Sequence, residues 1–314
     1  MSLSLPQASA NAPETDALLS GLLLSSAAVL ALVFGLMLVY VVRFRAGSSL
    51  NRGSIAKETF WIEIGWTTAT LVLFFGLFLW GADLYVREFH PPADALKIYV
   101  IGKQWMWKTE HAGGQREINA LHIPEGRPIQ LLMTSEDVIH DFSVPAFRLK
   151  HDVLPGRYET IWFTATRPGT YHLFCTQLCG TDHSNMVGEV DVLSKPDFQR
   201  WLASTGSAVS LVAQGRALFT RYGCSGCHHV EAGGGAGVVR APSLNGLYGS
   251  PVPLSDGTTT IADDLYIRDS ILEPGKQVVA SYANVMPSFA GQIDEEDLVK
   301  VIAFIKSLGS EGQE

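Results

Sequence analysis

The sequence has few charged residues, only four cysteines and no excess of basic side chains. Charged residues make up 17% of its 314 residues, whereas a soluble protein carries about 25%. A formal net charge of −8 excludes a protein that binds nucleic acid, because such a protein needs a basic face. Four cysteines do not make a small disulfide scaffold, and a hydrophobic share of 47% excludes a disordered chain. Thirty glycines and fifteen prolines do not suit a protein made only of membrane helices, so we expect one very apolar part and one ordinary part.

Two long uncharged runs account for the apolar part. Residues 17–42 carry no charge over 26 positions, and residues 64–82 carry none over 19. A helix of about 20 apolar residues crosses the hydrocarbon core of a bilayer. These lengths predict a transmembrane hairpin over residues 17–85 that contacts membrane lipid, rather than two buried core helices. The residues before the first run include two acids and no Lys or Arg, unlike a cleaved secretory signal, so we expect a retained helix.

The charges beside the two runs predict their orientation. Residues 43–63, between the runs, carry a net charge of +2, and residues 1–16 carry −2. Positively charged loops stay in the cytoplasm. We therefore expect a bacterial plasma-membrane protein with both termini on the outer, periplasmic side. Residues 1–16 are then an extracytoplasmic N-terminus, and everything after residue 85 also lies outside the cytoplasm.

The remaining sequence divides into two parts with different patterns. Five short segments are rich in β-branched and aromatic residues and are separated by turns with Pro and Gly: residues 96–101, 129–134, 158–164, 169–174 and 188–193. This spacing is typical of an all-β sandwich or barrel. Residues 211–222 and 295–308 have apolar side chains at three- and four-residue steps, which is typical of helices. The sequence predicts an all-β domain over 86–204 and an all-α domain over 205–314.

A haem-attachment motif lies in the predicted helical domain. In a C-x-x-C-H run such as Cys224-Ser-Gly-Cys227-His228, the two thiols attach a c-type haem and the histidine ligates its iron. Met286 is the only methionine after His228 and is the expected second axial ligand, which raises the haem potential as suits an electron carrier. His229 competes for that role, but we expect it to be exposed to solvent because its neighbour holds the other side of the iron.

The other two cysteines belong to a second cluster of metal-binding residue types. Cys175, Cys179, His183 and Met186 lie within twelve residues of each other, and His140 precedes them. Thiolate, thioether and imidazole ligands select copper or zinc. A single blue-copper ion would leave one cysteine unused, and a structural zinc ion would leave Met186 unused. Two copper ions bridged by both thiolates use every member, so the residues favour a binuclear copper centre.

These motifs resemble subunit II of the haem-copper cytochrome c oxidases. The copper loop of that family has the form C-x-E-x-C-G-x-x-H-x-x-M, and its first histidine lies in V-I-H-x-F, as in residues 175–186 and 138–142. The part after residue 204 resembles the class I cytochrome c domain that is fused to caa-type oxidases. Further matching segments lie across the chain: residues 63–67, 102–107, 121–124, 152–157, 162–165, 241–246, 266–274 and 286–291.

The resemblance implies a cupredoxin barrel above two membrane helices, a binuclear copper (CuA) centre and one haem c. The implied copper ligands are His140, Cys175, Cys179, His183, Met186 and the backbone carbonyl of Gln177. The family has a glutamate where this chain has Gln177, so a magnesium ion at the interface with the catalytic subunit loses its carboxylate ligand. Trp105 is implied as the residue through which electrons reach the copper, the alternative being a packed core tryptophan. Glu63 is implied at the start of a proton path, with Glu58 as its rival and a solvated helix end as the alternative.

The expected function is electron input to an oxygen-reducing complex. An external donor, either a cytochrome c or a quinol-oxidising complex, would reduce the haem. Electrons would then pass to the copper centre and on to the catalytic subunit I, which works with the other oxidase subunits. Two alternatives stay open: the same role in a nitric-oxide reductase complex, and a membrane-anchored copper-binding module. The net charge of −5 on residues 205–314 would steer a basic donor.

Overall fold

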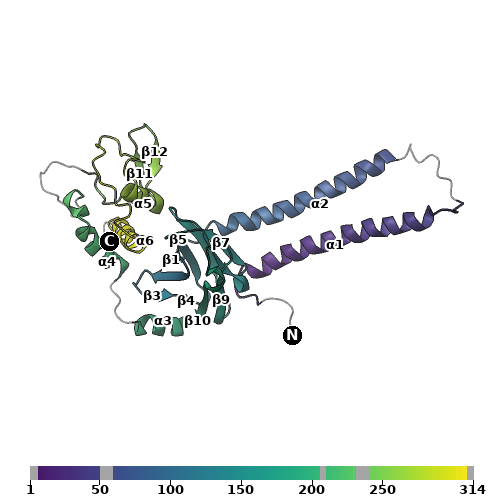
Figure 1. Cartoon of the computed structure of the whole chain (residues 1–314), viewed down its shortest axis with the longest axis horizontal. Helices are drawn as coiled ribbons and strands as arrows, with labels where there is room; N and C mark the ends of the chain where they lie inside the picture. Colours follow the sequence, from purple (N-terminus) through teal and green to yellow (C-terminus); the bar gives the residue numbers. More distant parts are fainter. Residues whose placement is uncertain (1–5, 50–58, 206–209, 229, 231–240, 310–314) are drawn as a thin grey trace.

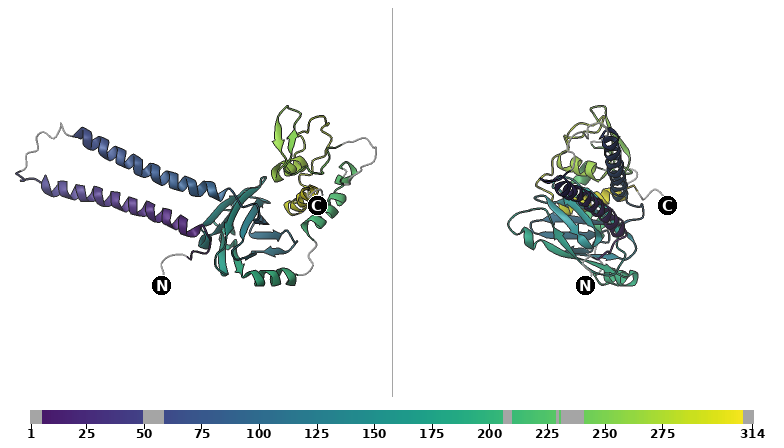
Figure 2. Two further views of the ribbon diagram at one scale, coloured as in Figure 1. Left: turned by 180° about the vertical axis from the view of Figure 1, so that it is seen from behind. Right: turned by 90° about the vertical axis from the view of Figure 1, so that its right-hand side faces the viewer.

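The protein consists of a helical hairpin, a β domain and a small helical domain (Figure 1). A computed structural model describes residues 6–49, 59–205, 210–228, 230 and 241–309. Two long antiparallel helices project from one side of the β domain, and the helical domain packs on the side away from them (Figures 1 and 2). This confirms the predicted fold class: two apolar helices, a cupredoxin-like β domain and a helical C-terminal domain.

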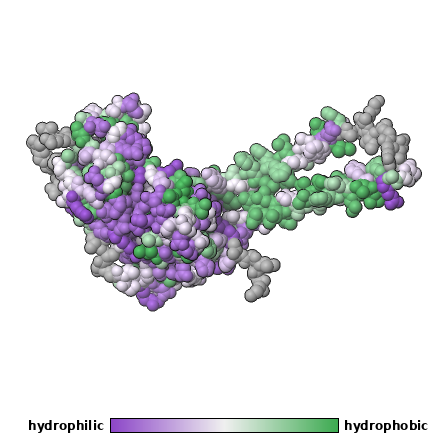
Figure 3. Space-filling model, viewed as in Figure 1, coloured by the Kyte–Doolittle hydropathy of each residue, from purple (hydrophilic) through white to green (hydrophobic). Residues whose placement is uncertain are grey.

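The hairpin consists of α1 (Ala12–Arg43) and α2 (Thr59–Glu88). Both helices are long and apolar enough to cross a membrane, and their most apolar windows bury none of their residues inside the protein. Figure 3 shows this apolar surface along both helices, against a mostly polar surface over the domains. Since a soluble protein rarely exposes so large an apolar area, lipid is the natural neighbour of this surface. Helix α1 begins five residues before the predicted apolar run.

The segment before α1 is part of the β domain. Ala8 is fully buried in the core of that domain, and the Ser9 hydroxyl donates a hydrogen bond to the carbonyl of Phe147 at 2.7 Å. Arg148 forms an ion pair with Asp16, in the second turn of α1, at 2.7 Å. The start of α1 and the end of α2 therefore lie at the same end of the hairpin, beside the β domain.

The β domain is a sandwich of two five-stranded sheets, with strand orders β3-β2-β1-β5-β8 and β4-β10-β9-β6-β7. Its strands are β1 (Leu96–Lys103), β2 (Met106–His111), β3 (Arg116–Ile118), β4 (Ala120–Pro124), β5 (Pro128–Ser135), β6 (His140–Val144), β7 (Leu149–Val153), β8 (Glu159–Thr164), β9 (Gly169–Cys175) and β10 (Val187–Leu193). The five predicted strands are confirmed as β1, β5, β8, β9 and β10. One apolar core fills the space between the sheets, with Trp107, Phe142 and Phe163 among its largest members.

Helix α3 (Lys195–Ser204) follows the sandwich and precedes the helical domain. That domain contains α4 (Leu211–Arg221), α5 (Asp264–Leu272) and α6 (Glu295–Ser307), and a ribbon of β11 (Pro251–Pro253) and β12 (Thr259–Ile261). The two predicted helices are confirmed as α4 and α6, whereas the pattern did not indicate α3, α5 or the ribbon. The boundary at residue 204 stays a prediction, because residues 206–209 lie outside the described part of the chain.

Helices α4 and α6 cross so closely that one position accepts only glycine. A Cβ atom on Gly215 would lie 1.9 Å from the Lys300 carbonyl oxygen and 2.8 Å from Cβ of Phe304. We expect Gly215→Ala to destabilise the helical domain by about 2–3 kcal/mol, because the backbones must separate to admit the methyl group. Denaturant unfolding followed through the helical signal in far-ultraviolet circular dichroism measures the loss. Thr220→Ala, on the exposed side of α4, is the matched control, and an equal effect of both substitutions would contradict the crossing argument.

Candidate metal centre and haem pocket

The sandwich brings His140 and the cysteine loop together at one end. His140 is the first residue of β6 and Cys175 is the last residue of β9, and the two strands pair with Phe142 opposite Cys175. The loop of residues 176–186 then leads into β10, and the Cys175 amide donates to the Met186 carbonyl at 3.1 Å. Because neighbouring β-strands hold both ends of the loop, its side chains have a rigid support.

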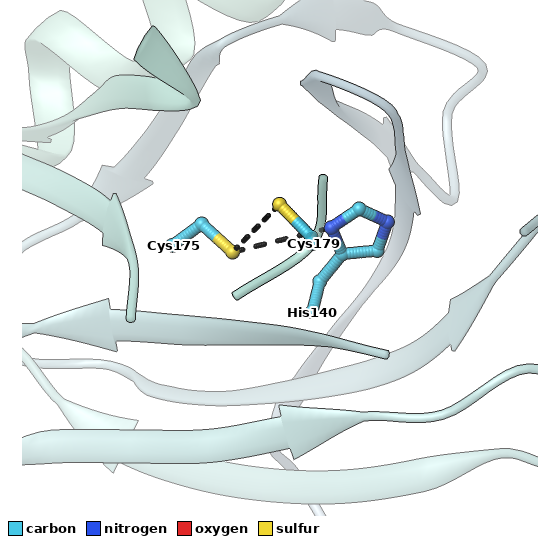
Figure 4. A group of neighbouring side chains, drawn as sticks. All are labelled: His140, Cys175 and Cys179. Carbon is cyan, nitrogen blue, oxygen red and sulfur yellow. Dashed lines mark hydrogen bonds between the residues drawn. The ribbon is translucent and has the colours of Figure 1, made fainter. Parts of the chain in front are cut away.

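The two thiols and the first imidazole converge in the interior (Figure 4). The Sγ atoms of Cys175 and Cys179 lie 3.7 Å apart, and Nδ1 of His140 lies 3.9 Å from the Cys175 sulfur. All three ligand atoms lie within 4.8 Å of one another, and all three residues are buried. Atoms bound to one tetrahedral metal ion at about 2.0–2.3 Å lie at just such separations. The cluster therefore fits a metal held between the two sulfurs.

The remaining predicted copper ligands surround the same cluster. Nδ1 of His183 lies 3.4 Å from the Cys179 sulfur, and Sδ of Met186 lies 3.8 Å from it. The Gln177 carbonyl oxygen lies 3.3 Å from the Cys175 sulfur, while the Gln177 side chain is exposed. The structure thus brings all six predicted ligands together, with imidazoles beside different sulfurs. Such a donor set suits two soft metal ions that share both thiolates.

The pKa values of the two thiols are shifted in opposite directions. Burial by itself raises the pKa of Cys175, but hydrogen bonds with His140 and with backbone groups bring that pKa below its usual value. Burial and the neighbouring Cys175 raise the pKa of Cys179. The site therefore offers one thiolate readily, and the second thiol loses its proton when a cation compensates the charge.

Trp105 lies directly against the cluster formed by His140, Cys175 and Cys179. Its indole N–H donates to the Cys179 carbonyl at 3.2 Å, and the side-chain amide of Gln104 donates to the same oxygen at 2.8 Å. Gly180 makes this contact possible, since its φ is +120° and a Cβ atom there would lie 2.9 Å from Nε2 of Gln104. Trp105 also packs against the core of the sandwich, as the alternative of a packed tryptophan expects, and its role in electron entry stays a prediction.

The helical domain contains an apolar cavity at the C-x-x-C-H motif. Its wall includes Cys224, Cys227, His228 and Met286. The Nδ1 atom of His228 lies 3.0 Å from the Pro242 carbonyl oxygen, which leaves Nε2 available to a metal. Burial lowers the pKa of His228 and so favours the neutral form that binds iron. His229 lies outside the described residues.

This cavity fits a covalently attached haem. Both thiols and both predicted axial ligands face one space, and most of its other lining residues are apolar, as an uncharged porphyrin face requires. The cavity is built on the core of the domain, where Phe219 and Phe304 stack edge to face at 5.4 Å. The two cysteines and the histidine of the motif are therefore brought together with Met286, as the sequence predicts.

Comparison with known families identifies two successive domains in the chain. The profile of the family described as "Cytochrome C oxidase subunit II, periplasmic domain" matches residues 115–192, and the cytochrome c profile matches residues 212–309. The chain is a cytochrome c oxidase subunit II with a fused cytochrome c domain. The two matches follow one another along the chain as the β domain and the helical domain do.

Two relatives each align with more than half of this chain. Cytochrome c oxidase subunit 2 of Alkalihalophilus pseudofirmus is 28% identical over 261 residues, which is 79% of this chain and 73% of that protein. The alternative cytochrome c oxidase subunit 2 of Bradyrhizobium diazoefficiens is 28% identical over 198 residues, 53% of this chain and 70% of the relative. Among solved structures, the periplasmic domain of subunit II of cytochrome oxidase from Bradyrhizobium japonicum has 29% identity and a TM-score of 0.37. It covers 38% of this chain and is itself covered completely.

The thiol–imidazole cluster of this subunit II has a supporting residue that the sequence did not reveal. The Nε2–H group of His140 donates to Oδ1 of Asp137 at 2.8 Å, and the edge of His140 lies against Trp107 with the ring centres 5.9 Å apart. A carboxylate on the second nitrogen fixes the orientation of a ligating histidine. The signal in the sequence was a carboxylate three residues before the histidine, in Asp137-Val-Ile-His140.

We expect Asp137→Asn to weaken copper binding by about 10–100-fold while leaving the two cysteines in place. The loss follows because an amide holds the imidazole of His140 less firmly than a carboxylate does. Competition with a copper chelator on the full chain measures the change. Asp182→Asn is the matched control, since Asp182 is an exposed acid of the same loop that bonds only Asn185 among the described side chains. Equal affinities of both variants would contradict a supporting role for Asp137.

Glu63 lies away from the thiol–imidazole cluster. It is exposed in the second turn of α2, and that end of α2 is far from the β domain (Figure 1). Its rival Glu58 lies outside the described residues. The roles suggested for Glu63 and for an interface magnesium ion remain predictions.

Proposed function

We propose that this subunit is the electron-input subunit of an aerobic terminal oxidase. With both cofactors bound, one-electron chemistry would carry electrons from an external donor, a cytochrome c or a quinol-oxidising complex, through haem to copper and on to the oxygen-reducing catalytic subunit I. The observation that supports this most strongly is the presence, in one chain, of a buried thiol–imidazole cluster and a haem-attachment cavity. Neither site offers a place for substrate bonds to be made or broken, so the proposed role is electron transfer.

Each of the two proposed centres has its own set of ligands. Cys175 and Cys179 would supply thiolates to two copper ions, His140 and His183 imidazoles, and Met186 and the Gln177 carbonyl weaker ligands. Cys224 and Cys227 would attach the haem, with His228 and Met286 on its iron. The protein's contribution is to hold these atoms in place and exclude water, because a site that does not rearrange lowers the cost of electron transfer.

Two residues and one metal ion extend the proposal. The hydrogen bond from Trp105 to the Cys179 carbonyl supports this indole as the group through which electrons reach the copper. Glu63 would lie at the start of a proton path into the catalytic subunit, since ionisable groups at the membrane are functional candidates. A magnesium ion at the subunit interface is not expected to bind as in the family, because Gln177 has no carboxylate.

The subunit would lie in a bacterial plasma membrane, spanning it twice. The packing of Ala8 in the β-domain core supports placing the described N-terminal residues on the same side of the membrane as the copper domain. The basic loop after α1 would then lie in the cytoplasm, with both metal domains on the periplasmic side.

Co-purification and turnover test this proposal. A tagged chain should purify from membranes with a haem-copper catalytic subunit, and the complex should consume oxygen with a reduced cytochrome c or quinol system as donor. Consumption of nitric oxide without oxygen uptake would favour the nitric-oxide reductase alternative. Purification of the chain alone, with a labile copper and no haem, would contradict the proposal and favour a copper-binding module.

A further inference from the structure

The cytochrome c domain packs on the copper domain through a buried apolar contact. Tyr99 of β1 is buried against Leu211 of α4 and against Val299 and Ala303 of α6, and Leu132 of β5 packs beside them. Relative motion of two domains is the ordinary expectation unless an apolar interface holds them together. The fused cytochrome is therefore seated on the sheet that contains β1 and β5.

Ion pairs cross the same interface beside this apolar contact. Glu296, in the first turn of α6, lies 2.6 Å from Nη1 of Arg116 and 3.8 Å from Nζ of Lys108. Arg116 also donates to the side-chain carbonyl of Gln214 on α4 at 2.7 Å. We refer to Lys108, Arg116 and Glu296 as the interdomain ion-pair cluster. Burial by itself raises the pKa of Glu296, but Lys300, Arg116 and Lys108 hold it below its usual value, so this carboxylate is charged at neutral pH.

A buried arginine fixes the other end of the interface. Arg268 of α5 is 7% exposed and donates to the carbonyl of Gly156, in the turn between β7 and β8, at 2.9 Å. It also donates to Glu295 at 2.5 Å. Separating the domains would break this hydrogen bond to a charged donor, which is among the stronger kinds of hydrogen bond in proteins.

The ion-pair cluster lies between the two cofactor sites. On the haem side, the Tyr222 hydroxyl donates to Asp297, which follows Glu296, and the Tyr222 ring lines the haem cavity. On the copper side, Lys108 contacts Glu136 at 2.9 Å, and the Glu136 amide donates to the Gly102 carbonyl at the end of β1. The turn after β1 carries Trp105, whose indole contacts Cys179. The cluster thus holds the haem-cavity wall next to the strand that leads to the copper.

We propose that Arg116 and Lys108 are positioning residues, whose pairing with Glu296 holds the cytochrome domain in the arrangement from which the haem reduces the copper centre. This inference rests on the proposed function. In the step itself, reduced haem iron gives up one electron and the oxidised copper pair accepts it, with no atom or proton transferred between the domains. The chain's own haem domain is then the partner of this copper-domain surface, and an external donor meets the cytochrome domain instead.

Charge reversal at Glu296 tests the inference in the purified, fully loaded complex. We expect Glu296→Arg to slow electron transfer from haem to copper, after rapid photoreduction of the haem, by about tenfold or more, because two attractions become repulsions. The potentials of both centres should not change. Adding Arg116→Glu and Lys108→Glu to the same chain restores the attraction across the interface but loses the Arg116–Glu110 and Lys108–Glu136 pairs within the copper domain, so it should restore part of the rate. Glu273→Arg, at an exposed acid on the same domain, is the matched control.

Hydrogen exchange gives a readout that does not depend on electron transfer. In Glu296→Arg, the amides of the turn at Gly156 and of the first turn of α4 should exchange faster, and in the triple variant they should exchange more slowly again. Unchanged exchange and transfer in Glu296→Arg would overturn the inference, as would a triple variant that regains protection but stays slow. A wild-type complex without haem or copper would instead contradict the proposed function, while the exchange experiment would still test the interface.

Discussion

Cys175→Ser should remove the binuclear copper centre and with it donor-driven oxygen uptake. The Cys175 sulfur lies next to the Cys179 sulfur, His140 and the Gln177 carbonyl, so no pair of metal ions can be bridged without it. We expect at most one copper per chain and activity below about 1% of wild type, because groups that act as a unit lose nearly all function together. Metal analysis and oxygen uptake of the purified complex measure both quantities.

Thr176→Ser is the matched control for this prediction. Thr176 follows Cys175 in the copper loop, and its hydroxyl bonds Asp141 and Lys150 rather than the metal cluster. A serine keeps that hydroxyl, so this variant should hold its full copper content. A Cys175→Ser chain that keeps two coppers and the wild-type spectrum would contradict the assignment of the bridging ligands.

The double substitution Cys224→Ala, Cys227→Ala should remove the covalent haem and leave the copper centre intact. The two thiols line the haem cavity in the cytochrome domain, whereas Cys175, Cys179 and Met186 of the proposed copper site belong to the core of the sandwich. A denaturing gel stained for haem should show no band, and turnover with an external donor should fall to about 1% or less if haem is the obligatory first acceptor. Copper content should remain at the wild-type value.

Met286→Leu separates haem attachment from haem ligation. The haem should stay covalently bound, while its potential falls by on the order of 0.1–0.2 V, within the roughly 0.8 V range that axial ligands control. Met106→Leu is the control, because Met106 belongs to β2 of the copper domain. An unchanged haem potential in Met286→Leu would show that another residue is the axial ligand.

The parts of the fold with a regular pattern could be predicted, and the parts fixed by distant contacts could not. Strands β1, β5 and β10 carry β-branched residues between clear turns, and α6 has apolar residues at helical spacing. Strand β6 gave no such signal, because it is short, fully buried and contains His140 and Asp141. Asp141 is tolerated there because Lys150 forms an ion pair with it at 2.8 Å. The insertion of Ala8 into the sandwich core is a tertiary contact with no local pattern.

The metal-binding residues could be predicted because each type has few roles in such spacings. Cys175 and Cys179 belong to one motif and Cys224 and Cys227 to another, and the spacing in each motif is typical of one kind of site. The interdomain contacts have no such motif, since Arg116 and Glu296 are 180 positions apart and each resembles an ordinary surface charge. The summed charge of the cytochrome domain was also ambiguous. Part of it is paired within the chain, since Glu296 pairs with Arg116 of the copper domain and Glu295 with Arg268 of its own domain, and so is not available to steer a donor.

Electron spin resonance of the purified chain, with metal and haem analysis, tests whether one chain holds both a binuclear copper centre and a haem. We expect two coppers per chain that share one unpaired electron, together with one covalently bound haem. The copper signal should then show hyperfine coupling to both nuclei and disappear on reduction. A signal from a single copper ion, zinc in place of copper, or a chain without covalent haem would contradict the account.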